Sequence, residues 1–192
     1  MDIAYYPGCS LHASSLLYDV QSRRIFSEIG IYLKEIEDWN CCGATSAGKV
    51  DDLLAVAMPA RNLGIAESAG FSEMVIPCSA CYSRTLVAQK ALDEAPALKE
   101  NINAELSKKI RGKIKVSSIL EVLLTAVASG DLAEKITKKL KGLKPVCYYG
   151  CLLTRFPQTV SVPDDVENPQ GMEKILKVLG VNAIDWSYKT DC

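Results

Sequence analysis

Short β-favouring runs alternate with longer stretches of helical periodicity along the first part of the chain. Residues 3–6 (IAYY) form the first run, and the pattern after them predicts a helix from about residue 14 to residue 29. Gly30 stands where a helix commonly ends. A second strand is expected over residues 31–36, so the chain begins as strand, helix, strand.

The same alternation continues further along the chain. A helix is expected over about residues 49–69, ended by Gly70 and interrupted at Pro59, because proline cannot donate a backbone hydrogen bond inside a helix. Residues 74–76 predict a third strand, and residues 83–92 predict the next helix. Strands that alternate with helices are typical of α/β folds, in which helices flank a parallel sheet.

The next segments are more polar. Residues 93–113 predict one or two inserted surface helices, followed by a strand at 114–116 and a helix at 118–128. Residues 134–144 (EKITKKLKGLK) are strongly basic, and a solvent-exposed helix is the simpler interpretation. Docking of this stretch to another protein of a complex is the alternative.

The chain contains an internal repeat with a period of about 140 residues. Two pairs of segments resemble each other: residues 4–9 with 146–151, and residues 25–39 with 175–186. We therefore expect a first domain over residues 1–144 and the N-terminal part of a second, similar domain over residues 145–192. The second copy is expected to be truncated inside its own motif.

Charge and hydropathy narrow the classes of protein further. The chain has 22 Lys and Arg against 23 Asp and Glu, which argues against electrostatic binding to nucleic acid or to an anionic membrane surface. No basic region followed by an apolar stretch opens the sequence, and its apolar runs are shorter than the ~20 residues of a membrane span. The expected location is cytoplasmic.

The eight cysteines are many for a reducing compartment, where structural disulfides seldom persist, so metal ligation is their expected use. Five of them follow predicted strands: Cys9 after the first, Cys41 and Cys42 after the second, and Cys78 and Cys81 after the third. Parallel strands present their carboxyl ends at one edge of the sheet, where ligands usually bind. These five thiols are therefore expected to converge.

Five converging thiolates are more than one tetrahedral zinc ion binds. A polynuclear iron–sulfur centre can use all of them, and the adjacent cysteines of the segment NCCGA (residues 40–44) can then reach different iron atoms. Two simpler interpretations remain open: the five cysteines are buried small apolar residues, or four of them bind zinc.

These motifs resemble those of a known family. The spacing C-x31-CC-x35-C-x2-C, in the contexts YYPGCS, NCCGA and PCSACY, resembles the cysteine-rich CCG domain found in the B subunit of heterodisulfide reductase. It is also similar to iron–sulfur subunits of glycolate oxidase, lactate utilisation and thiol-dependent fumarate reductase systems. The resemblance implies a Rossmann-like domain with a noncubane [4Fe-4S] cluster, whose five ligands would be Cys9, Cys41, Cys42, Cys78 and Cys81.

The resemblance also implies an activity and partners. The implied enzyme is a disulfide-reducing oxidoreductase that splits a disulfide, such as a CoM-S-S-CoB-like heterodisulfide, into two thiols. The implied partners are two further subunits of the complex, one a ferredoxin-like iron–sulfur protein and the other a flavin-containing protein. An electron-transfer module that cleaves no disulfide and a zinc-binding structural domain are the alternatives.

Four further residues are candidates for a role. By resemblance, Cys151 and Cys192 are the first two ligands of a second cluster, which is expected not to assemble, so this chain alone is expected to be inactive. Cys147 is expected to be a buried free cysteine. His12 is a candidate proton donor to a thiolate near the cluster, or a residue that packs against or caps the following helix.

Overall fold

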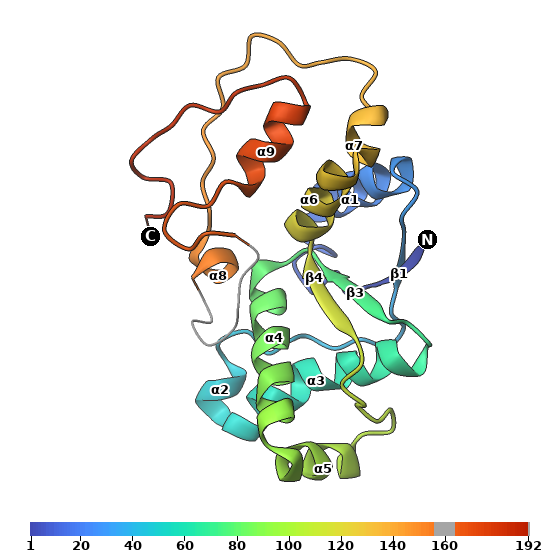
Figure 1. Ribbon diagram of the computed structural model, residues 1–192. Helices are drawn as coiled ribbons and strands as arrows, with labels where there is room; N and C mark the ends of the chain where they lie inside the picture. Colours follow the sequence, from blue (N-terminus) through green and yellow to red (C-terminus); the bar gives the residue numbers. More distant parts are fainter. Residues whose placement is uncertain (156–163, 192) are drawn as a thin grey trace. The chain divides into compact units, whose positions relative to one another are not determined.

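The chain forms two compact units, Met1–Ser118 and Ile119–Cys192. The computed structural model describes residues 1–155 and 164–191 (Figure 1). The division into domains at residue 144 stays a prediction. Within the described residues, no helix combines the length and the apolar character that a membrane crossing requires.

A four-stranded parallel sheet forms the centre of the first unit, with strand order β2-β1-β3-β4 (Figure 1). The strands are β1 (Asp2–Tyr5), β2 (Tyr32–Glu35), β3 (Glu73–Ile76) and β4 (Lys115–Ser118). All three strand pairs are parallel, which confirms the predicted α/β class. The chain leaves β1 toward β2 on one side and later returns to β3 on the other. The carboxyl end of β1 is therefore a topological switch point, where ligands of such folds bind.

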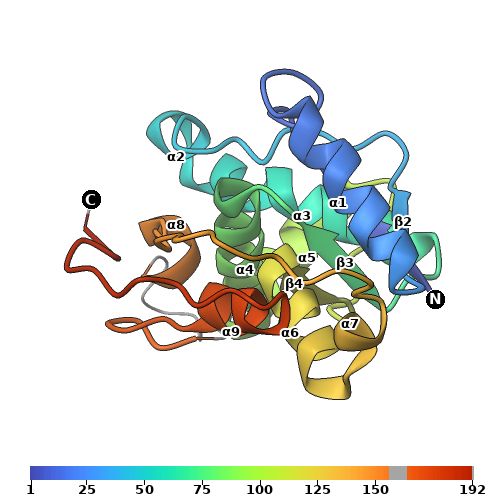
Figure 2. The same ribbon diagram turned by 90° about the horizontal axis from the view of Figure 1, so that it is seen from above.

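Helices connect the strands of this sheet. They are α1 (Leu16–Glu28), α2 (Ala47–Val50), α3 (Asp52–Ser68), α4 (Ser79–Glu94) and α5 (Pro96–Glu105). The helices α3 and α4 pack against each other, and Figures 1 and 2 show them side by side. The helix α4 begins four residues earlier than predicted, so Cys81 lies in its first turn.

The predicted interruption at Pro59 is wrong. Pro59 is buried inside the continuous helix α3, and the break lies at Asp51 instead. Asp51 has an extended backbone, and its carboxylate accepts hydrogen bonds from the N–H groups of Leu53 (2.6 Å) and Leu54 (3.3 Å). A side-chain cap of this kind satisfies the free amides of a helix start, so it determines where α3 begins.

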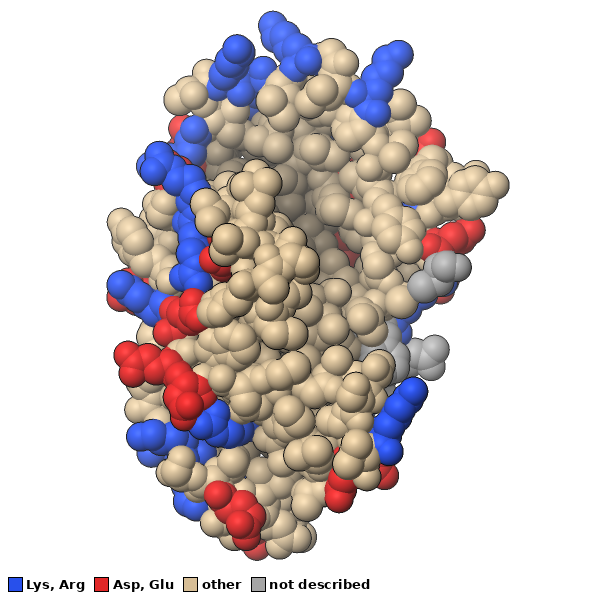
Figure 3. Space-filling view, turned by 180° about the vertical axis from the view of Figure 1, so that it is seen from behind, with Lys and Arg blue, Asp and Glu red and all other residues tan. Residues whose placement is uncertain are grey.

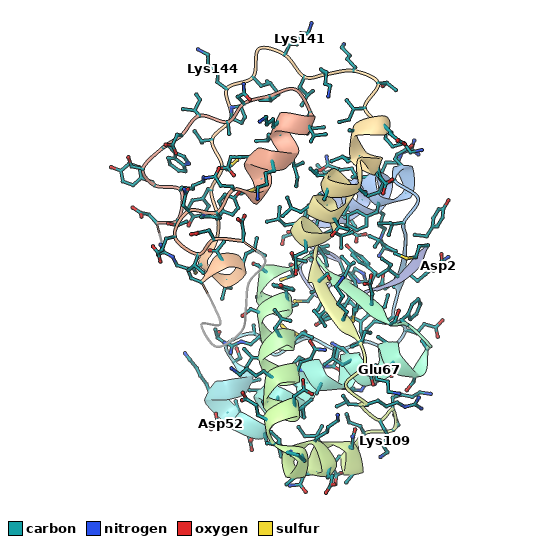
Figure 4. The ribbon with its side chains drawn as sticks, viewed as in Figure 1. Asp2, Asp52, Glu67, Lys109, Lys141 and Lys144 are labelled. Atoms are coloured by element: carbon teal, nitrogen blue, oxygen red, sulfur yellow. The ribbon has the colours of Figure 1, made fainter. Side chains whose placement is uncertain are left out.

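The polar segment between α4 and β4 contains one helix, α5, and a loop fixed by a single carboxylate. Glu67 of α3, labelled in Figure 4, accepts hydrogen bonds from the backbone N–H groups of Gly112 (2.9 Å) and Lys113 (2.7 Å). Beneath this loop, Ile110 packs with Ile102 of α5 in a small apolar cluster. The loop is therefore held on both its polar and its apolar side.

The second unit contains α6 (Ile119–Ser129), α7 (Asp131–Glu134), α8 (Cys151–Thr154) and α9 (Gly171–Val178). Leu120, Cys147 and Tyr149 form its buried cluster. The helix predicted over residues 134–144 is wrong, because the chain is not helical after Glu134. Neighbouring lysines repel one another on a helix, and Gly142 and Pro145 oppose helix formation at its end.

Candidate metal centre

Strand ends of the first unit place five cysteines near one another. Cys9 follows β1, and Cys78 is the residue before the first turn of α4, two positions after β3. Cys81 lies in that first turn, and the adjacent Cys41 and Cys42 lie in the loop between β2 and α2. The order of elements is therefore the one that the sequence pattern predicts.

The five thiols lie close enough to one another to influence each other's pKa values. The Cys41 thiol is hydrogen-bonded to those of Cys9 and Cys42. The Cys81 thiol is hydrogen-bonded to those of Cys42 and Cys78. The structure thus brings together all five residues that the spacing singles out. Their role as metal ligands is taken up as a proposal below.

The site has a buried floor and an open rim. Cys42 and Cys81 are each 2% exposed, whereas Cys9 and Cys41 are exposed to solvent and Cys78 is half-buried. In the described part of the chain, no three His, Cys, Asp or Glu side chains are arranged around a single-ion site. A donor set of five sulfurs suits a group with several metal atoms.

Two glycines allow the backbone to approach the sulfurs. Gly8 has a φ of +73°, and a Cβ atom there would lie 2.8 Å from the Cys81 Sγ atom. Gly43 has a φ of +80°, and a Cβ atom there would lie 2.5 Å from that of Ala47. Both positions combine a left-handed backbone with a lack of space, so a side chain cannot be added at either without rearrangement.

Hydrogen bonds prepare part of the site as thiolates. The pKa of Cys78 is lowered to about 5, first because the Cys81 thiol donates to its sulfur, and also because backbone N–H groups of Cys81 and Ala80 and the Ser10 hydroxyl donate to it. The pKa of Cys42 is lowered to about 7, mainly by donation from Cys81. Cys81 has one S–H proton, so it can serve only one of these two sulfurs at a time.

The pKa values of Cys81 and Cys41 are raised instead of lowered. The pKa of Cys81 is raised, first by its hydrogen bonds to Cys42 and Cys78 and then by burial. Burial is also the main cause that raises the pKa of Cys41, and the N–H group of Gly43 opposes it. At neutral pH the metal-free site is therefore a mixture of thiolates and thiols, and metal binding would release protons.

The lowered pKa of Cys78 predicts how the alkylation rate of this thiol depends on pH in the metal-free chain. The thiolate is the reactive form, so the rate at Cys78 should rise with a midpoint near pH 5 and stay high at about pH 6, where an ordinary thiol with a pKa of about 8.5 hardly reacts. Iodoacetamide labelling under anaerobic conditions, followed by peptide mass spectrometry, measures this midpoint. A midpoint at the ordinary thiol value contradicts the assignment.

A clamp from α3, which the sequence analysis missed, holds the residue before the cysteine pair. Asn62 accepts a hydrogen bond from the Asn40 N–H (3.0 Å) and donates one to the Asn40 carbonyl oxygen (2.8 Å). The buried Tyr6 hydroxyl donates to the same carbonyl oxygen (2.9 Å), and Arg61 donates to the Asn40 side chain (3.1 Å). The amide of Asn62, which follows Arg61 and precedes the apolar stretch LGIA, was the only sequence signal for this contact.

Asn62→Ala is expected to destabilise this loop. It leaves two backbone groups of Asn40 without these partners, which should lower the free energy of unfolding by about 2–4 kcal/mol and weaken iron retention. Asn103→Ala is the matched control, because Asn103 also makes two bonds to one backbone residue, Ile110, in the loop after α5. Denaturant unfolding and iron analysis should show a stability loss in both variants and iron loss only in Asn62→Ala. Equal iron retention contradicts the clamp's role.

His12 takes part in a polar network and lies in the loop between β1 and α1, which also contains Cys9. Its Nε2 atom is 3.1 Å from Glu35, and its ring meets Trp39 edge-on at 5.2 Å between centroids. Glu35 also accepts hydrogen bonds from Trp39 (2.9 Å) and Arg23 (2.7 Å). His12 thus contacts the Glu35 carboxylate and the Trp39 indole ring. Its role as a proton donor stays a prediction.

Of the second predicted pair of ligands, Cys151 lies in the other unit. Cys151 is the first residue of α8 and is half-buried. Cys192 lies outside the described residues. Cys147 is 4% exposed in the core of that unit, and burial is the main cause that raises its thiol pKa.

Comparisons with known proteins bear on this geometry. Residues 3–84, which include all five thiols, match the family model of the cysteine-rich domain called CCG. The chain is a CCG-domain protein. Proteins with CCG domains typically bind iron–sulfur clusters.

Two curated CCG relatives are subunits of oxidoreductase complexes. The chain is 33% identical to the 8-methylmenaquinol:fumarate reductase membrane anchor subunit of Wolinella succinogenes, over all of this chain and 66% of that protein. It is 23% identical to the B subunit of the ferredoxin:CoB-CoM heterodisulfide reductase of Methanosarcina acetivorans, over 84% of this chain and 55% of that protein. The chain therefore spans just under two thirds and just over half of the lengths of these relatives.

A solved structure shares the fold. A hypothetical protein from Helicobacter pylori superposes on 97% of this chain and 33% of its own, with a TM-score of 0.63 and 15% sequence identity. The likeness extends the α/β fold with a parallel sheet to a chain of low sequence similarity.

Proposed function

We propose that the first unit holds a noncubane [4Fe-4S] cluster through Cys9, Cys41, Cys42, Cys78 and Cys81, and that the CCG protein serves as an electron-transfer module of a multisubunit oxidoreductase of the fumarate reductase type. The observation that carries this proposal is the gathering of five thiols after three strands of one unit, close enough to shift one another's pKa values. When bound, such a cluster accepts and releases one electron at a time.

The residues of the site would position and tune this group. The buried Cys42 and Cys81 would form its inner attachment, while Cys9 and Cys41 would bind it from the solvent side. Backbone N–H groups of Gly43, Ala44 and Ala80 already point at cysteine sulfurs, and such donors favour added negative charge. The chain would therefore supply attachment, a low-dielectric floor and hydrogen bonds, and the cofactor would supply the redox chemistry.

Identity over the whole chain supports the electron-transfer role. The fumarate reductase relative matches this chain from end to end at 33% identity, a closer match than that to the heterodisulfide reductase relative. In such a complex, electrons would pass between this protein and its proposed partners, a ferredoxin-like iron–sulfur protein and a flavin-containing protein. Substrate would then react on a partner.

Disulfide reduction is the second candidate. The exposed rim at Cys9 and Cys41 leaves the site accessible to a small disulfide. The reaction would use two electrons and two protons to convert one disulfide, such as a CoM-S-S-CoB-like heterodisulfide, into two thiols. Zinc suits the site less well, because a tetrahedral ion would use four thiolates and leave the fifth without a metal.

Anaerobic reconstitution followed by EPR of the oxidised protein separates these functions. If the protein only relays electrons, small thiols such as coenzyme M should leave the spectrum unchanged. A new signal on adding thiol would contradict the relay and favour disulfide reduction, because it would report a substrate sulfur at the cluster. Absence of iron and acid-labile sulfide after reconstitution would contradict both.

A further inference from the structure

The segment after α7 exposes lysines and large apolar side chains together. Residues 135–148, here called the Lys–Leu segment, contain five lysines and no acidic residue, in a chain whose formal net charge is −1. Residues 137–144 are exposed at every position. Among them, Leu140 is 41% exposed and Leu143 is 57% exposed. An unshielded leucine pair inside a basic stretch is not explained by solubility alone.

The Lys–Leu segment is fixed to the body of its unit. The Leu140 N–H donates to the Leu179 carbonyl oxygen (2.9 Å), and the Lys139 ammonium donates to the Val178 carbonyl oxygen (2.6 Å) at the end of α9. The four remaining lysines form no ion pair with a carboxylate in the described part of the chain. Lys139 therefore anchors the segment, and the other four lysines are available to bind a negatively charged partner.

The outward side of the segment is apolar beyond the leucines as well. Cys147 and Tyr149 point into the buried core, whereas Val146 and Tyr148 alternate with them and are 50% and 52% exposed. Figure 4 shows Lys141 and Lys144 pointing away from the ribbon.

A second basic loop in the same chain lacks the exposed apolar side chains. Residues 108–113 carry three lysines and one arginine, all exposed. Their aliphatic neighbours Ile110 and Ile114 are buried, at 3% and 4% exposure. Positive charge is thus clustered both at residues 108–113 and in the Lys–Leu segment. Of these two, only the Lys–Leu segment also exposes aliphatic and aromatic side chains to water.

The near-zero net charge of the whole chain, whose basic and acidic side chains both appear on the face in Figure 3, argues against binding to an anionic membrane surface, but the local charge of residues 135–148 is strongly positive. We propose that this Lys–Leu segment binds the surface of an anionic phospholipid bilayer. Lysines on such a segment are attracted by anionic headgroups, while leucine, valine and tyrosine side chains enter the boundary between headgroups and acyl chains. An acidic protein surface would satisfy the lysines and leave the apolar groups unexplained. The inference rests on residues 135–148 alone and does not depend on the metal centre.

Vesicle sedimentation of the full chain tests this proposal. The protein should bind vesicles of phosphatidylcholine with about 30% phosphatidylglycerol, bind weakly to phosphatidylcholine alone, and dissociate as salt is raised. K138Q/K141Q/K144Q should lower the partition coefficient about five-fold per lysine, on the order of 100-fold in all. L140S/L143S keeps every lysine and should lower it at least about ten-fold. K108Q/K109Q/K113Q is the matched control and should bind like the unchanged protein.

Three results would overturn the proposal. The first is absence of binding to anionic vesicles, which would leave an acidic protein surface as the occupant. The second is binding that the control triple variant lowers as much as K138Q/K141Q/K144Q does. The third is binding that L140S/L143S leaves unchanged, because a purely electrostatic contact needs no leucine. Circular dichroism of each variant verifies that these surface substitutions leave the fold intact.

Discussion

Cys81→Ala is expected to remove the metal centre. The Cys81 thiol interacts with those of both Cys42 and Cys78, so its loss removes a buried sulfur that is one of the five proposed ligands. After anaerobic reconstitution, iron should fall from about four atoms per chain to nearly none. Iron and acid-labile sulfide analysis measures the change.

Cys147→Ala provides the matched control for this variant. Cys147 is a buried cysteine as well, but it lies in the core of the second unit. The control should lose some stability, as truncation of a buried side chain does, and keep its full iron content. Full iron retention in Cys81→Ala would contradict the assignment of Cys81 as a ligand.

Gly8→Ala is expected to have the second largest effect. The new Cβ atom would lie 2.8 Å from the Cys81 Sγ atom, and the φ of +73° is costly for a residue with a side chain. The free energy of unfolding should fall by about 2–5 kcal/mol, and iron binding should be lost because Cys81 must move. Denaturant unfolding and iron analysis give the two readouts.

Gly70→Ala separates the cost of the positive φ from the cost of the close approach to Cys81. Gly70 has a φ of +87°, but no atom lies within 4 Å of the position its Cβ atom would take. It should show only the backbone cost of about 1–2 kcal/mol and keep its iron. If Gly8→Ala and Gly70→Ala behave alike, close approach of the backbone to Cys81 is not what requires glycine at position 8.

The sequence predicts the gathering of the five cysteines well, for a topological reason. Residues 3–6, 31–36 and 74–76 are recognisable as strands, and strands separated by helices form parallel sheets. Cysteines that follow such strands must then lie at one edge, whatever the details of the loops. The position of Cys9, Cys41 and Cys78 at the same edge of the sheet can therefore be inferred from the sequence alone.

The contacts between side chains cannot be inferred in the same way. Asn62 reaches Asn40 across 22 residues, and neither position belongs to a recognisable motif. Local propensity predicts an interruption at Pro59, yet this residue is buried in α3, and the cap at Asp51 sets the helix start. Residues 135–144 have several good helix formers, but lysine repulsion and Gly142 outweigh them. Local pattern identifies elements, and tertiary contacts decide their ends.

One polynuclear iron–sulfur centre is proposed to bind five cysteines together: Cys9, Cys41, Cys42, Cys78 and Cys81. The most direct test is differential alkylation of the anaerobically reconstituted chain, with iron and sulfide measured on the same sample. About four irons and four sulfides per chain are expected. All five thiols should be protected from alkylation until a chelator removes the metal, whereas Cys151 should be alkylated throughout. One metal ion without sulfide, or only four protected thiols, would contradict this proposal.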